Sequence, residues 1–471
     1  MDLDLLAELR NRDEVLSAAA EVAGGDPLTA ASALRARGLE PGLAAAALTQ
    51  ATLRRSARAK FGSAADLMFF TRAGLEQATR SVVAERRTAR LAAAGVRTLA
   101  DLGCGLGSDA LAAARAGIHV YAVDADPLTA AVAAANVAAL GLTDRIEVSC
   151  ADATTVEVAR YDAVFADPAR RKAGRGRVFD PASFSPPWDF VAGLAERVPR
   201  TVLKLAPGID HALLPPGAEG EWVSVGGDLV EAAFWCGPLA SVPRRASLID
   251  PRGASLIDPR RASLADPRRA SLADPRRASL ADPRRASLAD PRRASPADPR
   301  RAAPADSREA SLIDPGLAGG PAGGRDPGDA HALPVHELTG SGEANGQVGA
   351  VGRWIYDPDP AVVRSHLVAE FAETVGGRLA DPEIAYVYAD EAVDTPFARR
   401  LEVTDVLPFS LKRLRALLRE RNVGRLEIRK RGSALEPEQL RRDLKLSGSA
   451  AAGLVLTRVA GAPTALVTSH S

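Results

Sequence analysis

Residues 96–108 read VRTLADLGCGLGS, a short apolar run that leads through one acid into three glycines spaced two residues apart. We expect a buried strand over residues 96–100 and a helix from about Ser108, with the glycine loop between them. Glycine lets a backbone turn sharply and approach a ligand closely, and the first turn of a helix presents free amide groups. The stretch therefore predicts a ligand-binding loop at the carboxyl end of a parallel strand.

Three further apolar runs follow the loop, and each ends at residues that suit a bound nucleoside or its reaction partner. These ends are Asp124-Ala125 after 118–123, Asp152-Ala153 after 146–150, and Asp167-Pro168-Ala169-Arg170 after 163–166. Parallel strands present their carboxyl ends along one edge of a sheet, so these residues should meet the glycine loop there. Asp124 is placed to accept hydrogen bonds from both ribose hydroxyls, and Asp152-Ala153 suits an adenine edge.

Strand-like and Ala-rich runs alternate over residues 96–243, which predicts an α/β, Rossmann-like domain with a parallel sheet and crossover helices. Residues 1–95 read as an N-terminal helical region, with breaks at 24–27 and 40–42 where Gly and Pro cluster. Residues 348–471 mix strand-like and helical runs, which predicts a smaller C-terminal α+β domain.

The composition excludes several classes of protein. Of the 471 residues, 46% are apolar and 25% are charged, and the formal net charge is +1, as in a globular protein of several domains. The three cysteines lack CxxC spacing and the six histidines include no HxxxH pair, so we expect no disulfide framework and no metal site. The acidic N-terminus lacks the features of a secretory signal, and no window of about 18 residues is wholly apolar. We therefore expect a cytoplasmic protein with no membrane partner.

From Ser247 to Ala318 the chain consists of nine successive octads, four of which read SLADPRRA while the others are variants of it. Proline in every octad breaks helices, and no octad offers a face that can bury a core. Residues 244–347 are therefore predicted to be a low-complexity, disordered insertion with a Gly/Pro-rich end. The recurring Arg-Arg-Ala-Ser resembles a basophilic kinase site. We favour the alternative that the octads are a tandem duplication with no activity of their own.

Basic residues cluster in three places around the predicted ligand site. The clusters are residues 54–60, in a stretch that also holds Arg86 and Arg87, residues 170–177, and residues 412–445. Such clusters neutralise phosphates and attract polyanions over long range. The alternative is that each cluster is the solvated face of a helix.

The glycine loop and the acids that follow it resemble the class I S-adenosylmethionine-dependent methyltransferases, whose first motif is acidic-x-Gly-x-Gly-x-Gly and matches DLGCGLG here. The resemblance implies that S-adenosylmethionine is the cofactor. Its methionine part would be held by Asp101, Gly103, Gly105 and Gly107, its ribose by Asp124 and its adenine by Asp152 and Ala153. Cys104 inside the loop and Ala125 beside Asp124 complete this candidate site. A dinucleotide-dependent oxidoreductase shares the loop, but a carboxylate at Asp101 would repel its pyrophosphate.

The chain is also similar to a narrower group, the bacterial methyltransferases with a C-terminal THUMP-like domain. Three stretches carry that similarity: LMFFTRAGLEQATR at 67–80, DPARR at 167–171 and LEIRKRGSALEPEQLRRDLKLSG at 426–448. THUMP domains bind RNA in RNA-modifying enzymes, so the resemblance implies an RNA partner, either tRNA or rRNA, gripped through the three basic clusters.

The segment after the fourth strand bears on what is methylated. Enzymes that methylate exocyclic amines of bases carry Asp/Asn-Pro-Pro followed by an aromatic residue, whereas this chain has Asp167 and Pro168 followed by Ala169 and Arg170. Asp167 can still orient an amine, and a guanidinium plane at Arg170 can stack on a base. We therefore expect methylation of a base nitrogen, with Asp167, Pro168 and Arg170 as the catalytic candidates. Two alternatives stay open: an RNA-binding protein that has lost catalysis, and a methyltransferase for a small molecule or a protein.

Overall fold

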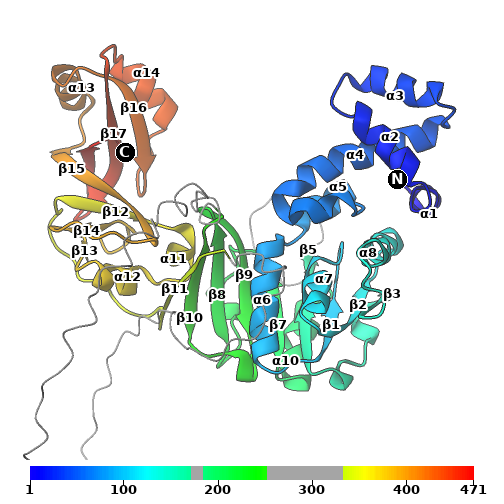
Figure 1. Cartoon of the computed structure of the whole chain (residues 1–471). Helices are drawn as coiled ribbons and strands as arrows, with labels where there is room; N and C mark the ends of the chain where they lie inside the picture. The colour runs from blue at the N-terminus through cyan, green and yellow to red at the C-terminus, as the bar shows by residue number, and fades with distance from the viewer. Residues whose placement is uncertain (171–183, 252–332, 471) are drawn as a thin grey trace, which may run out of the picture. The chain divides into compact units, whose positions relative to one another are not determined.

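The computed structural model describes residues 1–170, 184–251 and 333–470, in which the chain forms an N-terminal set of helices and two large β-sheets (Figure 1). Within these residues, no helix combines the length and the apolar character that crossing a bilayer requires.

The N-terminal region is helical, as the sequence predicts, and its helices restart at the two expected breaks. α3 begins at Pro27, where the Asp26 carboxylate accepts a 2.8 Å hydrogen bond from the Thr29 amide, and α4 begins at Pro41. Proline suits the first helical turn because the amide it lacks would have no partner there. The elements are α1 Leu3–Leu9, α2 Asp13–Val22, α3 Pro27–Ala36, α4 Pro41–Phe61, η1 Gly62–Asp66, α5 Arg72–Gln77 and α6 Ser81–Ala93.

The larger sheet has nine strands in the order β11-β10-β8-β9-β7-β4-β1-β2-β3. Strands β3, β2, β1, β4 and β7 are parallel, and β1 lies between β2 and β4. β9 runs antiparallel to both β7 and β8, so the sheet is mixed, and the expectation of a parallel sheet is right only for its first half. The strands are β1 Thr98–Leu102, β2 His119–Asp124, β3 Ile146–Cys150, β4 Ala163–Ala166, β7 Thr201–Leu205, β8 Glu219–Val225, β9 Asp228–Trp235, β10 Arg244–Ile249 and β11 Val335–Gly340.

Crossover helices join the parallel strands. α7, Ser108–Arg115, follows β1, and α8, Pro127–Ala139, follows β2; both pack against β2 and β3. Shorter elements connect the remaining strands. These are η2 Ala153–Thr155, η3 Val158–Arg160, the paired strands β5 Ala169–Arg170 and β6 Phe184–Ser185, α9 Trp188–Ala192, α10 Leu194–Arg197, η5 His211–Leu213 and η6 Gly237–Leu239.

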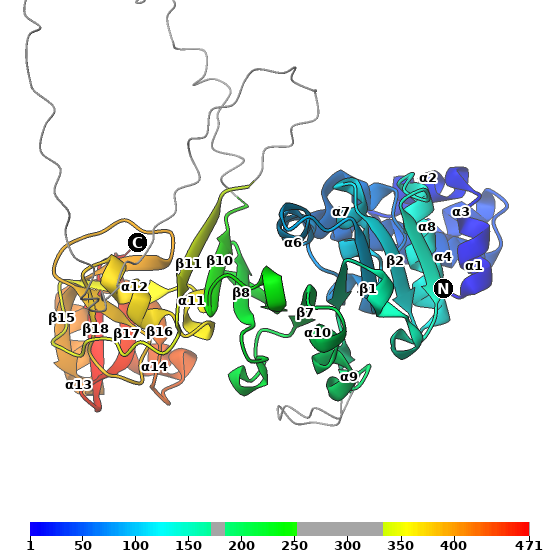
Figure 2. The same cartoon turned by 90° about the horizontal axis from the view of Figure 1, so that it is seen from below.

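Three boundaries differ from those expected. β2 spans His119–Asp124 rather than 118–123. β1 spans Thr98–Leu102 rather than 96–100, because its ladders with β2 and β4 continue to Leu102 and take Asp101 into the strand. β10 and β11 take both ends of the expected insertion into the sheet, where they lie side by side (Figure 2). Their apolar side chains, such as Ala246 and Leu338, are buried, so the expectation of disorder over 244–347 is wrong at its ends. The octads between, residues 252–332, lie outside the described residues.

Arginines of α6 attach this helix to acids of the sheet. Arg86 contacts Glu221 at 2.5 Å, and Arg90 contacts Glu219 at 2.5 Å. Burial alone would raise the pKa of Glu219, but hydrogen bonds from Arg90 and Arg245 lower it to about 2. Removing one partner of such a pair would leave a buried charge without compensation, at a cost of roughly 3–5 kcal/mol. Arg86 therefore belongs to the interior of the fold and not to a phosphate-binding surface.

The C-terminal sheet has seven strands in the order β13-β14-β12-β15-β18-β17-β16. β16 and β17 are parallel, and the α14 crossover between them packs with α13 on one face through Leu414, Leu418, Leu440 and Leu444. The elements are β12 Trp354–Pro358, α11 Pro360–Arg364, α12 Val368–Thr374, β13 Arg378–Leu379, β14 Val387–Ala389, β15 Ala398–Pro408, α13 Leu411–Glu420, β16 Val423–Lys430, α14 Pro437–Leu444, β17 Ala450–Val459 and β18 Ala462–Thr468.

A stack of three rings connects the nine-stranded sheet to the segment that follows α11. His211 lies over Trp222 with a centroid distance of 4.5 Å and over His366 with a centroid distance of 3.8 Å. Burial, together with the neighbouring His366 and Arg244, lowers the pKa of His211 to about 4. The ring is therefore neutral in the folded chain at neutral pH.

We predict that His211→Phe makes stability less sensitive to acid. Between pH 6.5 and about 4 the unfolded chain binds a proton at His211 that the folded chain does not, so wild-type stability falls as the pH drops through this window. The ring is partly exposed, so the contribution should be roughly 1–2 kcal/mol. Urea unfolding at pH 7 and pH 4.5 measures this contribution to the free energy of unfolding. His119→Gln, which replaces an exposed histidine, is the control. If the free energy of unfolding falls by the same amount between pH 7 and pH 4.5 in wild type and in His211→Phe, the assignment is contradicted.

We also predict that replacing residues 252–332 with a four-residue turn stabilises the fold. Ile249 and Val335 are paired neighbours in the ladder, so the shorter connection joins two ends that already lie together. Loop-closure entropy grows as the logarithm of length, which gives a gain of about 2–3 kcal/mol in the free energy of unfolding. A deletion of 244–340, which also removes β10 and β11, should instead destabilise the chain. A loss of stability in the shorter deletion would show that its residues pack on the fold.

Candidate functional site

The glycine loop lies where the ends of β1, β2 and β4 meet. Gly103, Gly105 and Gly107 have φ angles of 87°, 56° and 85°, which glycine adopts without strain. A Cβ on Gly103 would lie 2.9 Å from the carbonyl oxygen of Asp167, so only glycine lets β1 end this close to the end of β4. The amides of Gly103 and Cys104 both donate to the Val123 carbonyl at 2.9 Å. The structure thus brings the predicted loop and the predicted acceptor strand into direct contact.

Asp101 is fully buried, and neither of its carboxylate oxygens has a hydrogen-bond partner among the described residues. Burial raises the pKa of Asp101 well above its ordinary value, and the neighbouring Asp109 and Asp167 raise it further, against the effect of Arg87 and Lys204. A buried acid without a partner is costly, and a bound cation would relieve that cost. The site therefore favours a ligand with a positive group next to β1.

Asp124 ends β2 and is joined to the loop by a hydrogen bond. Its Oδ2 accepts from the Gly105 amide at 3.1 Å and its Oδ1 accepts from the Asp126 amide at 3.0 Å. Burial raises the pKa of Asp124, although both amides act in the opposite direction. A Cβ on Gly105 would meet nothing within 4 Å, so open space adjoins this contact.

Asp152 lies one strand further along the same edge. The neighbouring Ala151 amide donates to the Asp124 carbonyl at 3.2 Å, which ties the two strand ends together. Asp152 is exposed and caps η2, with its Oδ1 accepting from the Thr154 amide at 2.8 Å, and this hydrogen bond lowers the pKa of Asp152. Ala153 is buried, and Ala125, after Asp124, is exposed. The predicted nucleoside residues are therefore contiguous along one sheet edge.

Asp167 follows β4 and forms an ion pair that the sequence analysis missed. The Lys204 ammonium, at the end of β7, donates to Asp167 Oδ2 at 2.5 Å. Burial alone would lower the pKa of Lys204, but Asp167, Asp109 and Glu231 raise it above its ordinary value, so the lysine stays charged. The signal was present in the sequence as the single lysine of an otherwise apolar strand, TVLKL.

Arg87 is the second residue with an unexpected place. It is buried on α6 and ion-paired with both Asp109 and Glu231, and its guanidinium lies 4.6 Å from the Phe165 ring centroid. The expectation that Arg87 belongs to a phosphate-binding surface is wrong, because Arg87 is buried and its partners are the buried Glu231 of the sheet and Asp109 of α7. Arg87 and Lys204 are two cations that interact electrostatically with a group of four acids. The acids are Asp101, Asp109, Asp167 and Glu231.

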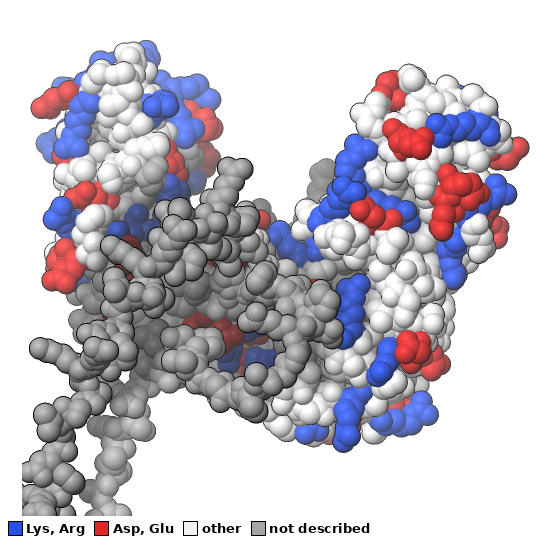
Figure 3. Space-filling model, in the orientation of Figure 1, with Lys and Arg blue, Asp and Glu red and all other residues white. Residues whose placement is uncertain are grey.

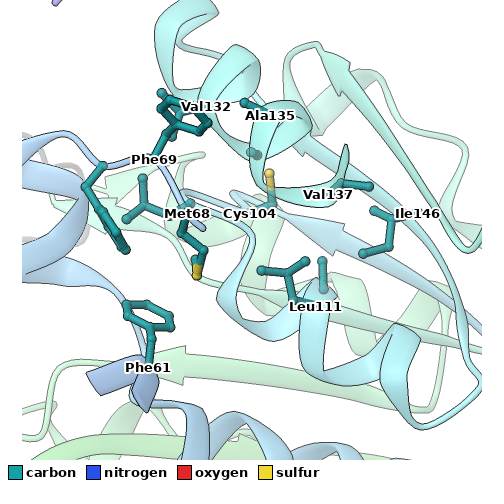
Figure 4. Close-up of a cluster of buried hydrophobic side chains, with 14 of the residues drawn as sticks. Phe61, Met68, Phe69, Cys104, Leu111, Val132, Ala135, Val137 and Ile146 are labelled. Atoms are coloured by element: carbon teal, nitrogen blue, oxygen red, sulfur yellow. The ribbon is translucent and has the colours of Figure 1, made fainter. Parts of the chain in front are cut away.

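Cys104 is buried beneath the loop with apolar side chains of the N-terminal helices and of α8 (Figure 4). Burial raises the pKa of the Cys104 thiol well above its ordinary value, so the thiol is neutral and poorly nucleophilic. This agrees with a packing role.

The basic cluster at residues 54–60 is largely used inside the fold. Arg58 pairs with Asp66 through two hydrogen bonds of 2.9 Å, and the Lys60 ammonium donates to three carbonyl oxygens around the end of α5. The side chain of Arg170 and residues 171–177 lie outside the described residues, so the second cluster is not placed. Phosphate contacts from 54–60 are thus restricted to Arg54 and Arg55.

The third cluster, 412–445, is more open. Blue and red side chains alternate over the C-terminal region in Figure 3, in line with ion pairs such as Arg421–Asp405 and Lys430–Glu436. Five cations of this cluster are exposed, and their side chains have no hydrogen bond or ion pair among the described residues: Lys412, Arg413, Arg419, Arg425 and Lys445.

Three family models match parts of the chain. A methyltransferase domain matches residues 99–171, which hold the glycine loop and the ends of β1 to β4. A THUMP domain-like family matches residues 398–470, from β15 to β18. A domain of unknown function matches residues 2–57, the first four helices.

Relatives and solved structures agree with these matches over most of the chain. Two proteins of Mycobacterium tuberculosis, from strains CDC 1551 and H37Rv, are each described as an uncharacterized S-adenosylmethionine-dependent methyltransferase. Both are 29% identical over 433 residues, which cover 89% of this chain and 94% of theirs. The crystal structure of a proposed methyltransferase from Porphyromonas gingivalis W83 is 18% identical, covers 98% of both chains and superposes with a TM-score of 0.62, which shows a common fold. These findings confirm the prediction from the sequence: the chain is a class I S-adenosylmethionine-dependent methyltransferase with a C-terminal THUMP-like domain.

Proposed function

We propose that this methyltransferase acts on RNA, either tRNA or rRNA, and transfers the methyl group of S-adenosylmethionine to a base nitrogen. The observation that carries the cofactor part of the proposal is the excess of acids around the glycine loop, in which the buried Asp101 has no partner among the described residues. At neutral pH the cofactor bears a sulfonium and an ammonium against one carboxylate, and its positive groups fit this surplus of negative charge.

The residues present fit the cofactor along the sheet edge. In our proposal the Asp101 carboxylate accepts from the ammonium of the methionine part, and Gly103, Cys104, Gly105 and Gly107 give the backbone room to approach it. Asp124, already fixed by the Gly105 amide, accepts from the ribose hydroxyls. Ala125, Asp152 and Ala153 adjoin the adenine at the next strand end.

Asp167 would orient the acceptor amine. Lys204 occupies only Oδ2, and Oδ1 has no hydrogen bond among the described residues, so Oδ1 can accept an N–H of the base. The ammonium of Lys204 holds the carboxylate in one orientation, which is what an in-line attack requires. Pro168 and Arg170 follow Asp167 in the sequence, and we propose that they contact the base that carries the amine.

Methyl transfer needs little further chemistry from the protein. The bound cofactor supplies an electrophilic methyl group on its sulfonium. The chain positions the nucleophile and excludes water from the reacting pair, and Asp167 keeps the nitrogen lone pair directed at the methyl carbon.

The RNA assignment draws on the C-terminal domain and its charge. Five exposed cations there have no partner among the described residues, and each can neutralise a backbone phosphate. The match to a THUMP domain-like family gives independent support, because domains of that name bind RNA in RNA-modifying enzymes.

We predict that Asp167→Asn slows methyl transfer by about a hundredfold and leaves cofactor affinity within about threefold, because the acid acts on the acceptor. The assay incubates labelled S-adenosylmethionine with total cellular RNA, and calorimetry measures cofactor affinity. Asp144→Asn, at an exposed acid outside the site, is the matched control. Cofactor binding without any label transfer would favour a non-catalytic RNA-binding protein. Label on protein or on small molecules instead of RNA would favour the other alternative acceptor.

We also predict that cofactor affinity depends on pH through Asp101. The raised pKa of Asp101 means that the free site carries a neutral acid at low pH, so affinity should rise with pH until the carboxylate is ionised and then level off. Asp101→Asn should weaken binding at least tenfold and flatten this dependence, since a charge-assisted hydrogen bond contributes roughly 1.5–3 kcal/mol. Calorimetry from pH 5 to pH 8, with wild type and with Asp101→Asn, tests the pH dependence of cofactor affinity and the loss of affinity in the variant. A variant that binds as tightly as wild type, with the same pH profile, would remove Asp101 from the cofactor site.

A further inference from the structure

A cavity of about 590 Å³ lies between α2 and α4, away from the glycine loop. Leu16 and Ala51 give it an apolar floor, and Arg54, Arg55 and Arg58 of α4 line it together. Positions 54, 55 and 58 project to one side of a helix, because residues three and four apart are neighbours on its surface. The volume is in the range of cavities that hold small organic ligands.

Two of the three guanidiniums have no carboxylate within ion-pair distance among the described residues. Arg54 donates through Nε to the Met68 carbonyl at 2.8 Å and through Nη2 to the Leu67 carbonyl at 3.3 Å, so its Nη1 is left for a ligand. Arg55 donates through Nη2 to the Ala23 carbonyl. Burial lowers the pKa of Arg54 despite the presence of Asp66 and Asp13 at the cavity. Only Arg58 is neutralised, by Asp66. The charged side chains that line the cavity, three arginines and two aspartates, thus leave an excess of one positive charge.

Hydrogen bonds connect this cavity to the glycine loop. Arg54 holds the Met68 carbonyl, and the next residue, Phe69, donates its amide to Asn136 Oδ1 at 2.6 Å. The Asn136 amide group donates in turn to the Leu106 carbonyl at 3.0 Å, in the middle of the loop. Figure 4 shows Met68 and Phe69 packed against Cys104 and α8 at this junction.

We propose that this cavity binds one nucleotide of the RNA acceptor, with a backbone phosphate between Arg54 and Arg55. The inference rests on the proposed function and adds a second contact for the same substrate. Guanidiniums suit phosphate because their planar forks match its oxygens. The apolar floor, continued by the exposed Leu67, takes the sugar or base. RNA seated here would also stabilise the segment that supports the glycine loop.

Two exposed positions on α2 test the site without changing an arginine. Ala20 and Asp13 both line the cavity. Ala20→Glu adds a negative charge beside the guanidiniums and should weaken binding of a mixed-sequence RNA oligonucleotide about fivefold at 0.1 M salt. Asp13→Asn removes a negative charge and should strengthen binding about twofold. Ala45→Glu adds the same charge to an exposed position of α4 outside the cavity, and it should change affinity less than twofold.

The measurement is fluorescence anisotropy with the full chain, alongside calorimetry with S-adenosylmethionine, whose affinity should be unchanged in all three variants. Opposite effects of Ala20→Glu and Asp13→Asn on RNA affinity, with Ala45→Glu near wild type, would support the site. Equal RNA affinity in all variants, or equal weakening by Ala20→Glu and Ala45→Glu, would overturn it. If wild type binds RNA no better than a neutral polymer, the proposed function itself fails, and this outcome is distinct from the other two.

Discussion

A buried carboxyl group without a partner is the constraint around which the site is organised. Asp101 lies in β1, the middle one of the five parallel strands, near two other acids and two cations, and neither of its oxygens has a hydrogen-bond partner among the described residues. Buried polar groups without a hydrogen-bond partner are rare in folded proteins, unless a bound ligand supplies the partner. The glycines that follow allow β1 to end against β4, so Asp101 shares one edge with Asp124, which we propose binds the ribose, and with Asp167, which we propose orients the acceptor. Lys204 and Arg87 keep this concentration of negative charge compatible with a folded chain.

Local sequence predicted the parts of the site that depend on local structure. The strands at 146–150 and 163–166 have the expected bounds, because the alternating run IEVSC and the apolar run AVFA are each short and are followed by an aspartate within two residues. β1 was displaced by two residues, since its pairing on both sides decides where it ends and no local signal reports that pairing. Arg86 and Arg87 look like surface arginines in sequence, and only their partners on β8 and β9, far along the chain, show them to be buried. Lys204 was missed for the same reason: its role depends on Asp167, which belongs to another strand.

The N-terminal helices support the methyltransferase domain as well as covering it. Asn136 is fully buried on α8, and its side chain bonds both to Phe69 and to the Leu106 carbonyl of the glycine loop. Such a buried amide is satisfied only when all of its partners are in place, so it fixes one relative position of helix and loop. The second large core similarly joins Trp222 of the nine-stranded sheet with Tyr356 and Phe371, which precede the THUMP-like segment. The cofactor edge is thus held by packing from both ends of the chain.

β10 carries the sequence RRASLI and leads into Asp250-Pro251, so the first octad begins inside this strand and supplies its last three residues, Ser247–Ile249. Its Ser247 is fully buried and donates to Glu221 at 2.5 Å, so this copy is closed to any kinase. Later copies repeat the same unit between two strands that stay paired with each other. Each replication slip that gains or loses an octad therefore preserves the reading frame and returns the chain to the same ladder. Because loop-closure entropy grows only as the logarithm of length, one octad more or fewer should change the free energy of unfolding by only about 0.1 kcal/mol.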